Sequence, residues 1–520
     1  MTIKPLRLLH ETLVQSAERF PVKTALVVEG NSFTYSQLCD TSARIAFLLL
    51  ERGLKRGDRV AIYMDNTFMA AASIYGALMA GGCFLVINPQ TKSDKLEYIL
   101  NDSGAKILIT DAHLSFAFEP ILKSLKDLAG LFYSGEWVSP VPDHSALLFP
   151  VNALSEVLPK AMALAHSLTI IPLDLSALIY TSGSTGNPKG VMQTHQSMLF
   201  AAQSIAQYLR LNSDHRVLNV LPLAFDYGLY QLLMSILMGA TLVLERSFAF
   251  PAQIFNRMNE QKVSVFPGVP TIYSTIISMH RRKPLCFPLV DRITNTAAAL
   301  PADYNAELRQ IFSNALIYRM YGLTECKRVC YLEPEKADLK PESVGRAIPG
   351  TEVFLLSPEG KPVGPGSPGV LHVRGPHVML GYWKLPEQSR KMLKEGHYPG
   401  ERILCTHDWF TMDEDGDLYF KGRSDDIIKS RGEKVSPVEV ENVLLGLKGV
   451  REAAVIGVAD ELLGQAVKAF VVVDDQAITD RHILKHCTLR LENFMVPKYI
   501  EIVADLLKTE SGKITKKDLK

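Results

Sequence analysis

The stretch of the chain best suited to chemistry is the loop YTSGSTGNPKG, residues 180–190. Its glycines let backbone N–H groups converge on one anion, its hydroxyls add donors, and its lysine supplies a positive charge. These properties suit a triphosphate. The loop differs from a Walker A loop, because Lys189 follows Pro188 and no Ser or Thr comes after it. The candidate contacts are Thr181, Ser182, Gly183, Ser184, Thr185, Gly186 and Lys189.

The residues on either side of this loop argue against the alternative, a disordered linker. Residues 176–180 (SALIY) predict a strand that enters the loop. Val191 and Met192 continue the chain as a short apolar piece that leads toward a helix. A loop tethered at both ends is better suited to binding a ligand than a free linker is.

The loop resembles the [YF]TSGSTGxPKG motif of the adenylate-forming superfamily, which contains acyl-CoA synthetases, adenylation domains of nonribosomal peptide synthetases, and luciferases. Further motifs follow in the family's order almost to the C-terminus. Residues 321–325 (YGLTE) are similar to the family's YGxTE. This resemblance implies that Tyr321 lies beside the adenine, Thr324 approaches the α-phosphate, and Glu325 helps to hold Mg²⁺. Attack at phosphorus requires such positioning and a cation.

Two further motifs resemble the family's ribose and hinge segments. Residues 405–408 (CTHD) stand in the place of TGD, so that Asp408 would accept both ribose hydroxyls, while His407 replaces the usual glycine. Residues 422–426 (GRSDD) match GRxDD. Arg423 would contact the ribose or a phosphate, with a surface ion pair as its alternative role. Asp425 would be the hinge between two domains.

The lysine-rich C-terminus carries one lysine to which the resemblance gives a role. Lys513 matches the lysine of the family's GK pair and would bridge the substrate carboxylate and the phosphate oxygens. After adenylation, rotation about Asp425 would withdraw Lys513 and bring in residues 430–434 for thioester formation. We interpret Lys516, Lys517 and Lys520 as solubilising charges.

Asp226 is the only formal charge between Val217 and Leu244. A lone carboxylate in such an apolar segment is costly if it is buried without a partner. It could cap the helix that we expect to begin at Tyr227. It could instead await a cation such as a substrate ammonium, which is the interpretation we favour.

The resemblance bears on which acid is activated. Amino-acid-activating members carry FDxS, in which the Asp binds the α-amine, and Phe225–Gly228 (FDYG) keeps the Phe-Asp. The run is most similar to stand-alone enzymes that activate L-proline and load it onto a carrier protein. The segment GLTECKRV, residues 322–329, occurs also in acyl ligases and does not discriminate. By motif spacing, the acid pocket would be lined by Asp226, Tyr227, Tyr230, Gly268, Asn295, Met320 and Val329.

Alternating helix and strand patterns must position these residues. Thr34 and Gln37 predict a capping box that opens a helix, and residues 59–64 predict a strand. The uncharged run Phe68–Ile87 has the length of a membrane span, but the Gly81-Gly82 pair favours a buried helix followed by a strand. This alternation indicates a parallel sheet flanked by helices.

The amino-acid composition and the predicted secondary structure change twice later in the chain. Residues 343–422 are rich in Gly and Pro and predict short strands, and after Arg423 a compact unit follows. In that unit Ser436 and Pro437 begin a helix, strands cover 453–458, 467–473 and 499–503, and a second helix covers 483–491. With the resemblance, the predicted fold class is α/β. A large N-terminal domain, 1–424, would contain parallel sheets with helices and a small β-barrel-like subdomain, and a small mobile α+β domain would cover 425–520.

The composition of the chain limits the classes of protein to which it can belong. The chain has 520 residues, of which 47% are hydrophobic and 21% charged, and a net charge of +1. Nucleic acid and anionic membrane are therefore not expected as partners. The N-terminus lacks the apolar core of a signal peptide. Seven scattered cysteines suit reduced thiols, Cys326 and Cys330 are interpreted as packing residues, and we expect a cytoplasmic location.

Together these features predict an AMP-forming acid–thiol ligase with ATP and Mg²⁺ as cofactors. It would activate an amino acid, with L-proline as the first choice, and transfer it to the phosphopantetheine thiol of a separate carrier protein. The alternative is an acyl-CoA synthetase for a fatty or aryl carboxylic acid. A non-catalytic binding module is disfavoured, because the loop, Glu325, Asp408 and Lys513 fill all the chemical roles.

Overall fold

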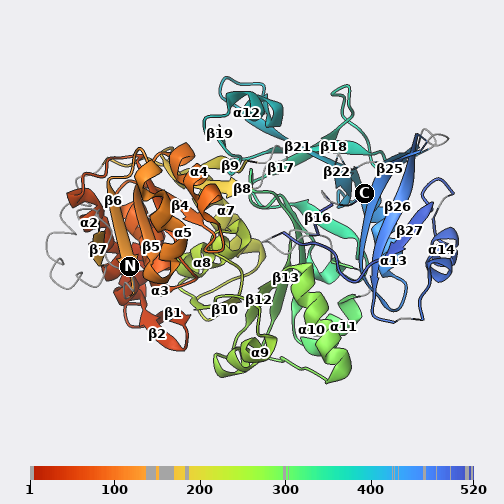
Figure 1. Cartoon of the computed structure of the whole chain (residues 1–520), viewed down its shortest axis with the longest axis horizontal. Coiled ribbons are helices and arrows are strands. Elements are labelled where there is room, and N and C mark those ends of the chain that lie inside the picture. The colour runs from red at the N-terminus through yellow and green to blue at the C-terminus, as the bar shows by residue number, and fades with distance from the viewer. Residues whose placement is uncertain are drawn as a thin grey trace. The chain divides into compact units, whose positions relative to one another are not determined.

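The computed structural model describes residues 5–135, 148–150, 169–181, 187–296, 300, 301, 304–423, 426, 428–430, 433–460, 464–475, 477–491, 493–509, 514–516 and 519. The chain divides into two compact units (Figure 1). The first contains residues 1–267, 323–327 and 375–393, and the second contains 268–322, 328–374 and 394–520.

One sheet of the first unit has the strand order β19-β9-β8-β4-β3-β5-β6-β7. Strands β8, β4, β3, β5, β6 and β7 run parallel, whereas β9 and β19 are antiparallel additions at one edge. The bounds are β3 Arg59–Tyr63, β4 Cys83–Ile87, β5 Ala105–Asp111, β6 Gly130–Ser134, β7 Leu148–Pro150, β8 Leu175–Thr181, β9 Lys189–Thr194 and β19 Gly381–Tyr382.

The helices between these strands follow local sequence signals. The Thr34 side chain and Gln37 form the predicted capping box at the start of α2, Tyr35–Glu51. The uncharged run contains α3, Phe68–Met79, and then β4, with Gly81 between them at φ +74°, as predicted. The other elements here are α4 Ser93–Ser103, η1 Ala112–Leu114, α5 Ser115–Phe118, η2 Glu119–Ser124 and α12 Pro386–Met392.

No helix among the described residues combines the length and the apolar character needed to cross a bilayer.

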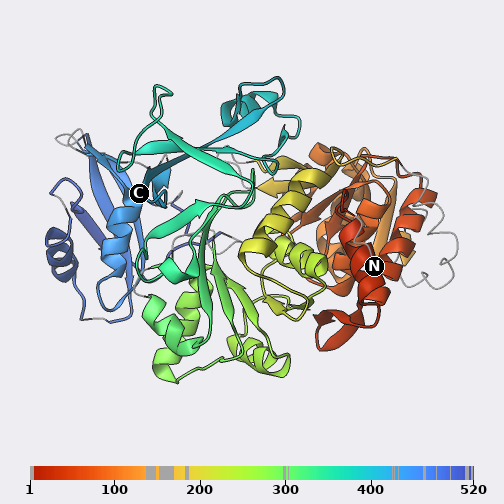
Figure 2. The ribbon, with the colours of Figure 1, turned by 180° about the vertical axis from the view of Figure 1, so that it is seen from behind.

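The first unit also contains the mainly parallel strands β12-β10-β11-β1, with β2 antiparallel at the end. Helices α7 and α8 pack side by side, and α1 lies against α8. Figure 2 shows α1 in red, α7 in yellow and α8 in yellow-green. The bounds are β1 Thr24–Val28, β2 Asn31–Thr34, β10 Arg216–Asn219, β11 Thr241–Leu244, β12 Val265–Gly268, α1 Glu11–Arg19, α7 His195–Tyr208, α8 Asp226–Met238 and α9 Pro251–Glu260.

The second unit begins with the parallel pair β13 and β14, continued by antiparallel strands in the order β15-β16-β22-β21-β18-β17. Gly and Pro interrupt this region and most of its strands are short, as the sequence predicts, but β21 has 11 residues. The bounds are β13 Arg292–Asn295, β14 Leu316–Tyr321, β15 Cys330–Tyr331, β16 Ser343–Ala347, β17 Glu352–Leu356, β18 Gly369–Arg374, β20 Leu393–Glu395, β21 Arg402–Met412, β22 Leu418–Arg423, α10 Pro270–Arg282, α11 Tyr304–Ile311 and η5 Pro334–Lys336.

The C-terminal residues form a smaller α+β layer with its own core. Ser436 caps α13, where its hydroxyl accepts a 3.3 Å hydrogen bond from the N–H of Glu439. Val440 and Ile483 are fully buried in that core. The bounds are β23 Ile428–Ser430, β24 Glu433–Val435, α13 Pro437–Leu445, β25 Val450–Asp460, β26 Gly464–Val473, α14 Asp480–Thr488 and β27 Tyr499–Ile502. The predicted α/β class with a small C-terminal α+β domain is confirmed.

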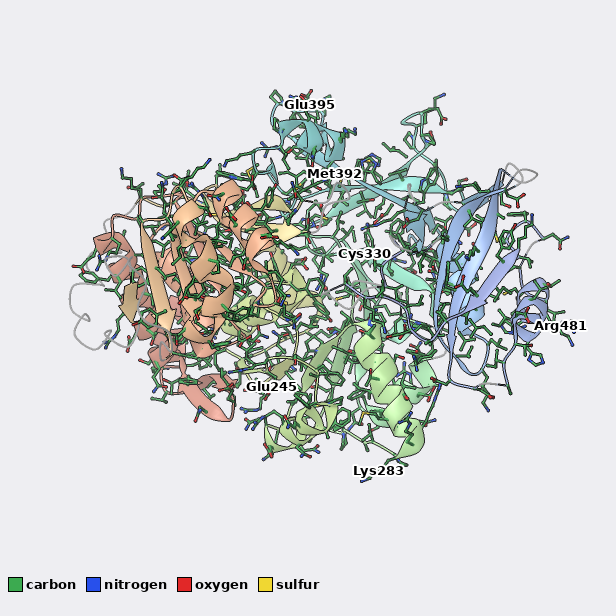
Figure 3. All side chains as sticks on the ribbon, viewed as in Figure 1. Glu245, Lys283, Cys330, Met392, Glu395 and Arg481 are labelled. Atoms are coloured by element: carbon green, nitrogen blue, oxygen red, sulfur yellow. The ribbon has the colours of Figure 1, made fainter. Side chains whose placement is uncertain are left out.

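All seven cysteines are free thiols, and Cys326 and Cys330 are fully buried. Burial raises the pKa of the Cys330 thiol well above its ordinary value. Figure 3 labels Cys330 among the side chains of the second unit. A protonated, enclosed thiol is inert, which agrees with a packing role.

Candidate active site

Asp408 and Tyr321 meet in the second unit. Tyr321 ends β14, and its hydroxyl donates a 2.5 Å hydrogen bond to Oδ2 of Asp408 in β21. The Tyr321 ring packs edge-on against Phe410, with centroids 4.8 Å apart, and stacks at 6.1 Å on Phe420. Asp408 is only 5% exposed. The sequence assigned these two residues to the ribose and the adenine separately, and the structure brings them into contact.

Arg423 completes this group. It lies opposite Asp408 in the β21–β22 register, and its Nε is 3.5 Å from Oδ1 of Asp408. His407, which replaces the family's glycine, adopts φ +57°. That left-handed conformation favours glycine but is tolerated by histidine more often than by most residues. The substitution therefore keeps the backbone turn and leaves the Asp408 carboxylate in place.

A second group forms in the first unit around Tyr382. The Tyr382 hydroxyl donates a 2.6 Å hydrogen bond to Oε1 of Glu325, and the Lys189 Nζ lies 5.5 Å from the centroid of the same ring. Tyr382 stands on β19, which pairs with β9 of the glycine-rich hairpin. One tyrosine thus links the predicted magnesium ligand to the predicted phosphate-binding lysine.

Hydrogen bonds also fix the YGLTE turn. Gln193 Nε2 donates to the carbonyl of Thr324 at 3.3 Å, and Ser197 orients Gln193 by donating to its Oε1 at 2.8 Å. The Met379 N–H donates to the carbonyl of Glu325 at 2.8 Å. These contacts hold the backbone of Thr324 and Glu325 against the β9 side of the first unit.

The antiparallel strands β8 and β9 lie on either side of the glycine-rich loop. Thr181, the last residue of β8, lies opposite Lys189, the first residue of β9. Ser182, Gly183, Ser184, Thr185 and Gly186 lie outside the described residues, as do Asp425 and Lys513. The roles assigned to these seven residues rest on the resemblance.

The described residues fit a nucleotide and its metal ion in chemical type. A carboxylate accepts hydrogen bonds only, so Asp408 suits a pair of ribose hydroxyls. Glu325 offers a hard oxygen, and Mg²⁺ is commonly bound through one or two carboxylates together with substrate phosphates. Since Tyr382 donates to Oε1 of Glu325, the orientation of this carboxylate is fixed before any ligand arrives.

The residues predicted to contact the acid fall on several elements. Asp226 opens α8 as its first helical residue and is 8% exposed, while Tyr227 and Tyr230 are 1% exposed on the same helix. The alternative that Asp226 caps a helix beginning at Tyr227 is wrong. The helix begins at Asp226 itself, the N-cap position is Phe225, and no side-chain capping bond is present there.

Gly228 shows why this helix carries FDYG rather than FDxS. A Cβ at residue 228 would lie 2.3 Å from the carbonyl oxygen of Pro222 and 2.8 Å from that of Leu221. The Phe225 N–H donates to the same Pro222 carbonyl at 3.0 Å, which fixes that oxygen. Serine cannot enter without moving backbone.

The other predicted acid contacts lie in the second unit. A Cβ at Gly268 would lie 2.8 Å from the Tyr273 ring, and the Tyr273 hydroxyl donates to the carbonyl of Thr294 at 2.9 Å. Asn295 ends β13 and Met320 lies in β14, 3% and 4% exposed. Val329 is fully buried.

One lysine of the C-terminus has a partner that the sequence did not suggest. The Lys516 Nζ lies 2.7 Å from Oε1 of Glu441 in α13. Burial raises the pKa of Glu441, and Lys516 opposes that rise. The interpretation of Lys516 as a solubilising charge is therefore wrong, because it pairs with a partly buried carboxylate.

Sequence reasoning missed Gln193 and Tyr382, which belong to these groups, and it also missed the buried Lys327. Tyr382 lies 57 positions from Glu325, so no local pattern connects the two. Lys327 is 1% exposed, although lysine normally stays in solvent. Its position two residues after Glu325 was the only available signal.

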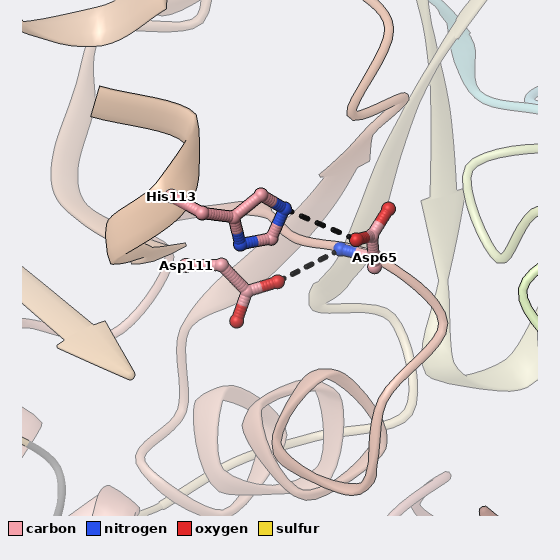
Figure 4. A group of neighbouring side chains, drawn as sticks. All are labelled: Asp65, Asp111 and His113. Carbon is pink, nitrogen blue, oxygen red and sulfur yellow. Dashed lines mark hydrogen bonds and ion pairs between the residues drawn. The ribbon is translucent and has the colours of Figure 1, made fainter. Parts of the chain in front are cut away.

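A carboxylate–histidine cluster lies elsewhere in the first unit (Figure 4). The Asp65 N–H donates to Oδ2 of Asp111 at 3.0 Å, and His113 Nε2 lies 3.2 Å from Oδ2 of Asp65. The Arg246 guanidinium lies 3.7 Å from the same oxygen. Burial raises the pKa of Asp111 to about 6. Because the Arg246 guanidinium already lies beside this cluster, we interpret it as structural.

Comparisons with known protein families cover nearly the whole chain. Residues 13–383 match the family described as AMP-binding enzyme, and residues 439–513 match the AMP-binding enzyme C-terminal domain. The long-chain-fatty-acid–CoA ligase of Bacillus subtilis (strain 168) is 32% identical, over 99% of this chain and 94% of the relative. The feruloyl-CoA synthase of Amycolatopsis sp is 32% identical, over 98% of this chain and 97% of the relative.

Solved structures agree with these relatives. The anthranilate CoA ligase AuaEII in complex with anthranoyl-AMP superposes with a TM-score of 0.87 at 28% identity, over 98% of this chain and 96% of that one. The o-succinylbenzoate CoA synthetase of Bacillus subtilis in complex with ATP and magnesium ion gives a TM-score of 0.82 at 26% identity, over 98% of both chains.

Proposed function

The chain belongs to the AMP-binding enzyme family, and from this premise we propose that it joins a fatty or aryl carboxylic acid to AMP and then to the thiol of coenzyme A. The predicted enzyme class, an AMP-forming acid–thiol ligase, is confirmed. So are the predicted cofactors, since a relative of this fold binds ATP and magnesium ion.

The structural observation that carries the proposal is the Asp408 carboxylate. It is nearly enclosed and is held between the Tyr321 hydroxyl, which donates to one oxygen, and the Arg423 guanidinium beside the other. A preorganised carboxylate next to an aromatic ring suits a ribose with an adenine stacked nearby. Such preorganisation reduces the ordering that binding requires.

The remaining roles follow the chemistry of attack at the α-phosphorus. Thr181 and Lys189 would contact the phosphates, and Lys189 would offset their charge. Thr324 would donate to an oxygen of the α-phosphate. Glu325 would hold Mg²⁺, which neutralises charge that develops on the phosphate oxygens. We assign Lys513 to the approach of the carboxylate, and Asp425 to the hinge about which residues 425–520 turn between the two half-reactions.

The acid substrate follows from the relatives rather than from the FDYG run. Ligases of long-chain fatty acids, ferulate and anthranilate are similar to this chain over nearly its full length. Asp226 is also not in the FDxS context of amino-acid-activating members, because Gly228 excludes serine. The alternative reading of the sequence, an acyl- or aryl-CoA ligase, is therefore the better supported one. The cytoplasmic location stays a prediction.

One observation favours a second candidate, the activation of L-proline for a carrier protein. No hydrogen bond or ion pair joins the Asp226 carboxylate to another residue that the structure describes. A carboxylate left in this state could bind a substrate ammonium. The acceptor would then be a phosphopantetheine thiol on a separate protein.

Acid-dependent exchange of labelled pyrophosphate into ATP tests both candidates. The assay uses dodecanoate, ferulate, anthranilate and L-proline as acids, and then coenzyme A as the acceptor. We expect exchange with a fatty or aryl acid and a thioester with coenzyme A. Exchange with proline alone would replace the first candidate by the second. Exchange with none of a wider panel of acids would contradict adenylate formation itself.

A further inference from the structure

A lysine ammonium is buried beside the helix that carries Asp226. Lys327 is 1% exposed, and its Nζ lies 5.7 Å from the centroid of the Tyr230 ring. The backbone at Lys327 is left-handed, with φ +64°, and its N–H donates to the carbonyl of Leu323 at 2.7 Å. A tight turn at the end of the YGLTE motif thus directs this side chain inward.

Asp226 lies one helical turn before Tyr230 on the same face of α8. Residues four apart on a helix are neighbours, with Cβ atoms about 5–6 Å apart. Helical side chains also tilt toward the helix N-terminus, so the Tyr230 ring covers the turn that begins at Asp226. The ammonium over this ring and the Asp226 carboxylate are therefore on the same part of α8.

We propose that Lys327 is a specificity-determining residue: its ammonium supplies the positive charge that Asp226 requires, and this side of α8 therefore takes an acid without an ammonium group. The inference rests on the proposed function and narrows its substrate class. No ion pair within 4.0 Å joins Lys327 and Asp226 among the described residues, so the proposed compensation acts over a longer distance, beside the Tyr230 ring.

Charge balance gives the physical reason. An isolated charge in a buried site is strongly disfavoured, whereas two opposite charges compensate one another. Lys327 already brings a positive charge to the part of α8 that carries Asp226 and Tyr230. An amino acid would add a second cation beside a single carboxylate, while a fatty or aryl acid would add none. Removal of the lysine charge would leave Asp226 in need of a cation and favour an amino acid.

A double-mutant cycle tests the pairing without any substrate. Lys327→Met keeps the length of the side chain and removes its charge, Asp226→Asn keeps the shape, and the third variant combines both. Urea unfolding is measured for all three. We expect each single variant to be less stable than wild type, and the double variant to be more stable than the sum of the two losses predicts. Additive losses would overturn the pairing.

The same variants test specificity through pyrophosphate exchange with dodecanoate, ferulate and L-proline. For Lys327→Met we expect the ratio of proline to dodecanoate or ferulate exchange to rise at least tenfold. The double variant should return toward the wild-type ratio, and Lys327→Arg should keep it. If Lys327 had only a structural role, Lys327→Met would lower exchange with all acids alike. That result would contradict the proposal.

The two readouts separate this inference from the proposed function. If the unfolding cycle shows coupling but no fatty or aryl acid supports exchange, the proposed function is contradicted and the pairing of Lys327 with Asp226 stands. If those acids support exchange but the cycle shows no coupling and Lys327→Met leaves the ratio of proline to dodecanoate or ferulate exchange unchanged, only the inference about Lys327 is contradicted. Should Lys327→Met fail to fold, the double variant must still fold if the pair exists, and its failure while Asp226→Asn folds normally would overturn it.

Discussion

Tyr321 and Tyr382 have the same local role toward two different carboxylates. Each donates a short hydroxyl hydrogen bond, at 2.5 Å to Asp408 and at 2.6 Å to Glu325. Hydrogen bonds to charged groups are stronger than neutral ones and contribute about 1.5–3 kcal/mol each. At the scale of single residues, the two tyrosines therefore set the orientation of the carboxylates that would meet ribose and magnesium.

Tyr321→Phe should weaken ATP binding. The variant keeps the ring packing on Phe410 and loses the hydroxyl that orients Asp408, so we expect the KM for ATP to rise roughly tenfold with a smaller change in kcat. Steady-state kinetics with varied ATP measures this. Tyr331→Phe is the matched control, because the Tyr331 hydroxyl makes a similar 2.5 Å bond to Glu333. Equal effects of the two variants would contradict the role of Tyr321.

Tyr382→Phe should change the magnesium requirement. With its hydroxyl bond to Oε1 removed, Glu325 becomes free to rotate, and we expect the Mg²⁺ concentration for half-maximal exchange to rise roughly threefold to tenfold. A magnesium titration at saturating ATP measures it. Tyr419→Phe is the control, since the Tyr419 hydroxyl donates to Asp413 at 3.0 Å. An unchanged magnesium profile would leave Tyr382 with a packing role only.

The sequence predicted the kinds of residue in these groups but not their partners. Asp408 and Glu325 could be assigned because each lies in a short motif with a chemical requirement. Their hydroxyl donors lie 87 and 57 positions away along the chain, and only the folded sheets bring them together. Lys327 was missed for another reason: a lysine in a sequence predicts solvent exposure, and the tertiary fold overrides that preference.

Helix α8 shows which features of a helix can be predicted from its own sequence and which cannot. Its start was predicted to within one residue, from Tyr227 to the observed Asp226. The capping box at α2 was predicted with both partners, and the start of α13 at Ser436 was predicted as well, because these signals lie within one turn. The need for glycine at residue 228 was not foreseen, since the clashing atom belongs to the preceding loop.

Gly228→Ser should destabilise the protein rather than make it an amino-acid enzyme. The new Cβ would lie 2.3 Å from the Pro222 carbonyl, and backbone must move to admit it. Overpacking of this kind costs about 1–3 kcal/mol. Urea unfolding measures the loss. Gly364→Ser is the matched control, because a Cβ added at that residue would have no atom within 4 Å. Full stability of Gly228→Ser would show that the loop before α8 adapts freely.

At the scale of the whole molecule, burial shifts the pKa values of several titratable groups, and these shifts have opposite effects on stability at low pH. His195 opens α7 and accepts a 3.1 Å hydrogen bond from the Leu9 N–H, and its ring centroid lies 6.0 Å from that of His10. Burial lowers the pKa of His10 from 6.5 to about 4 and that of His195 from 6.5 to about 3. Burial raises the pKa of Asp111 from 3.8 to about 6.

These shifts set the sign of the pH dependence of stability. Near pH 5 both histidines bind protons in the unfolded chain but not in the folded one, whereas Asp111 binds a proton only in the folded one. The unfolded state thus binds about one proton more, so stability falls by about 1.4 kcal/mol per pH unit as pH decreases. The contribution of the histidines is complete above pH 6.5 and is lost as pH falls toward their folded pKa values of about 4 and 3. Downward pKa shifts at His372 and His486 add to this, and the upward shift at Glu441 opposes it.

Replacing both buried histidines should therefore reverse the acid response. In the variant His10→Asn with His195→Asn, Asp111 keeps its large upward shift, which by itself makes the folded state bind about one proton more than the unfolded state near pH 5. We expect its free energy of unfolding to rise, by up to about 1.4 kcal/mol per pH unit, as pH decreases from 6.5 to 5. Urea unfolding at several pH values measures the slope. His397→Asn, at an exposed position, should keep the wild-type slope, and a double variant that also keeps it would show that other groups govern the acid response.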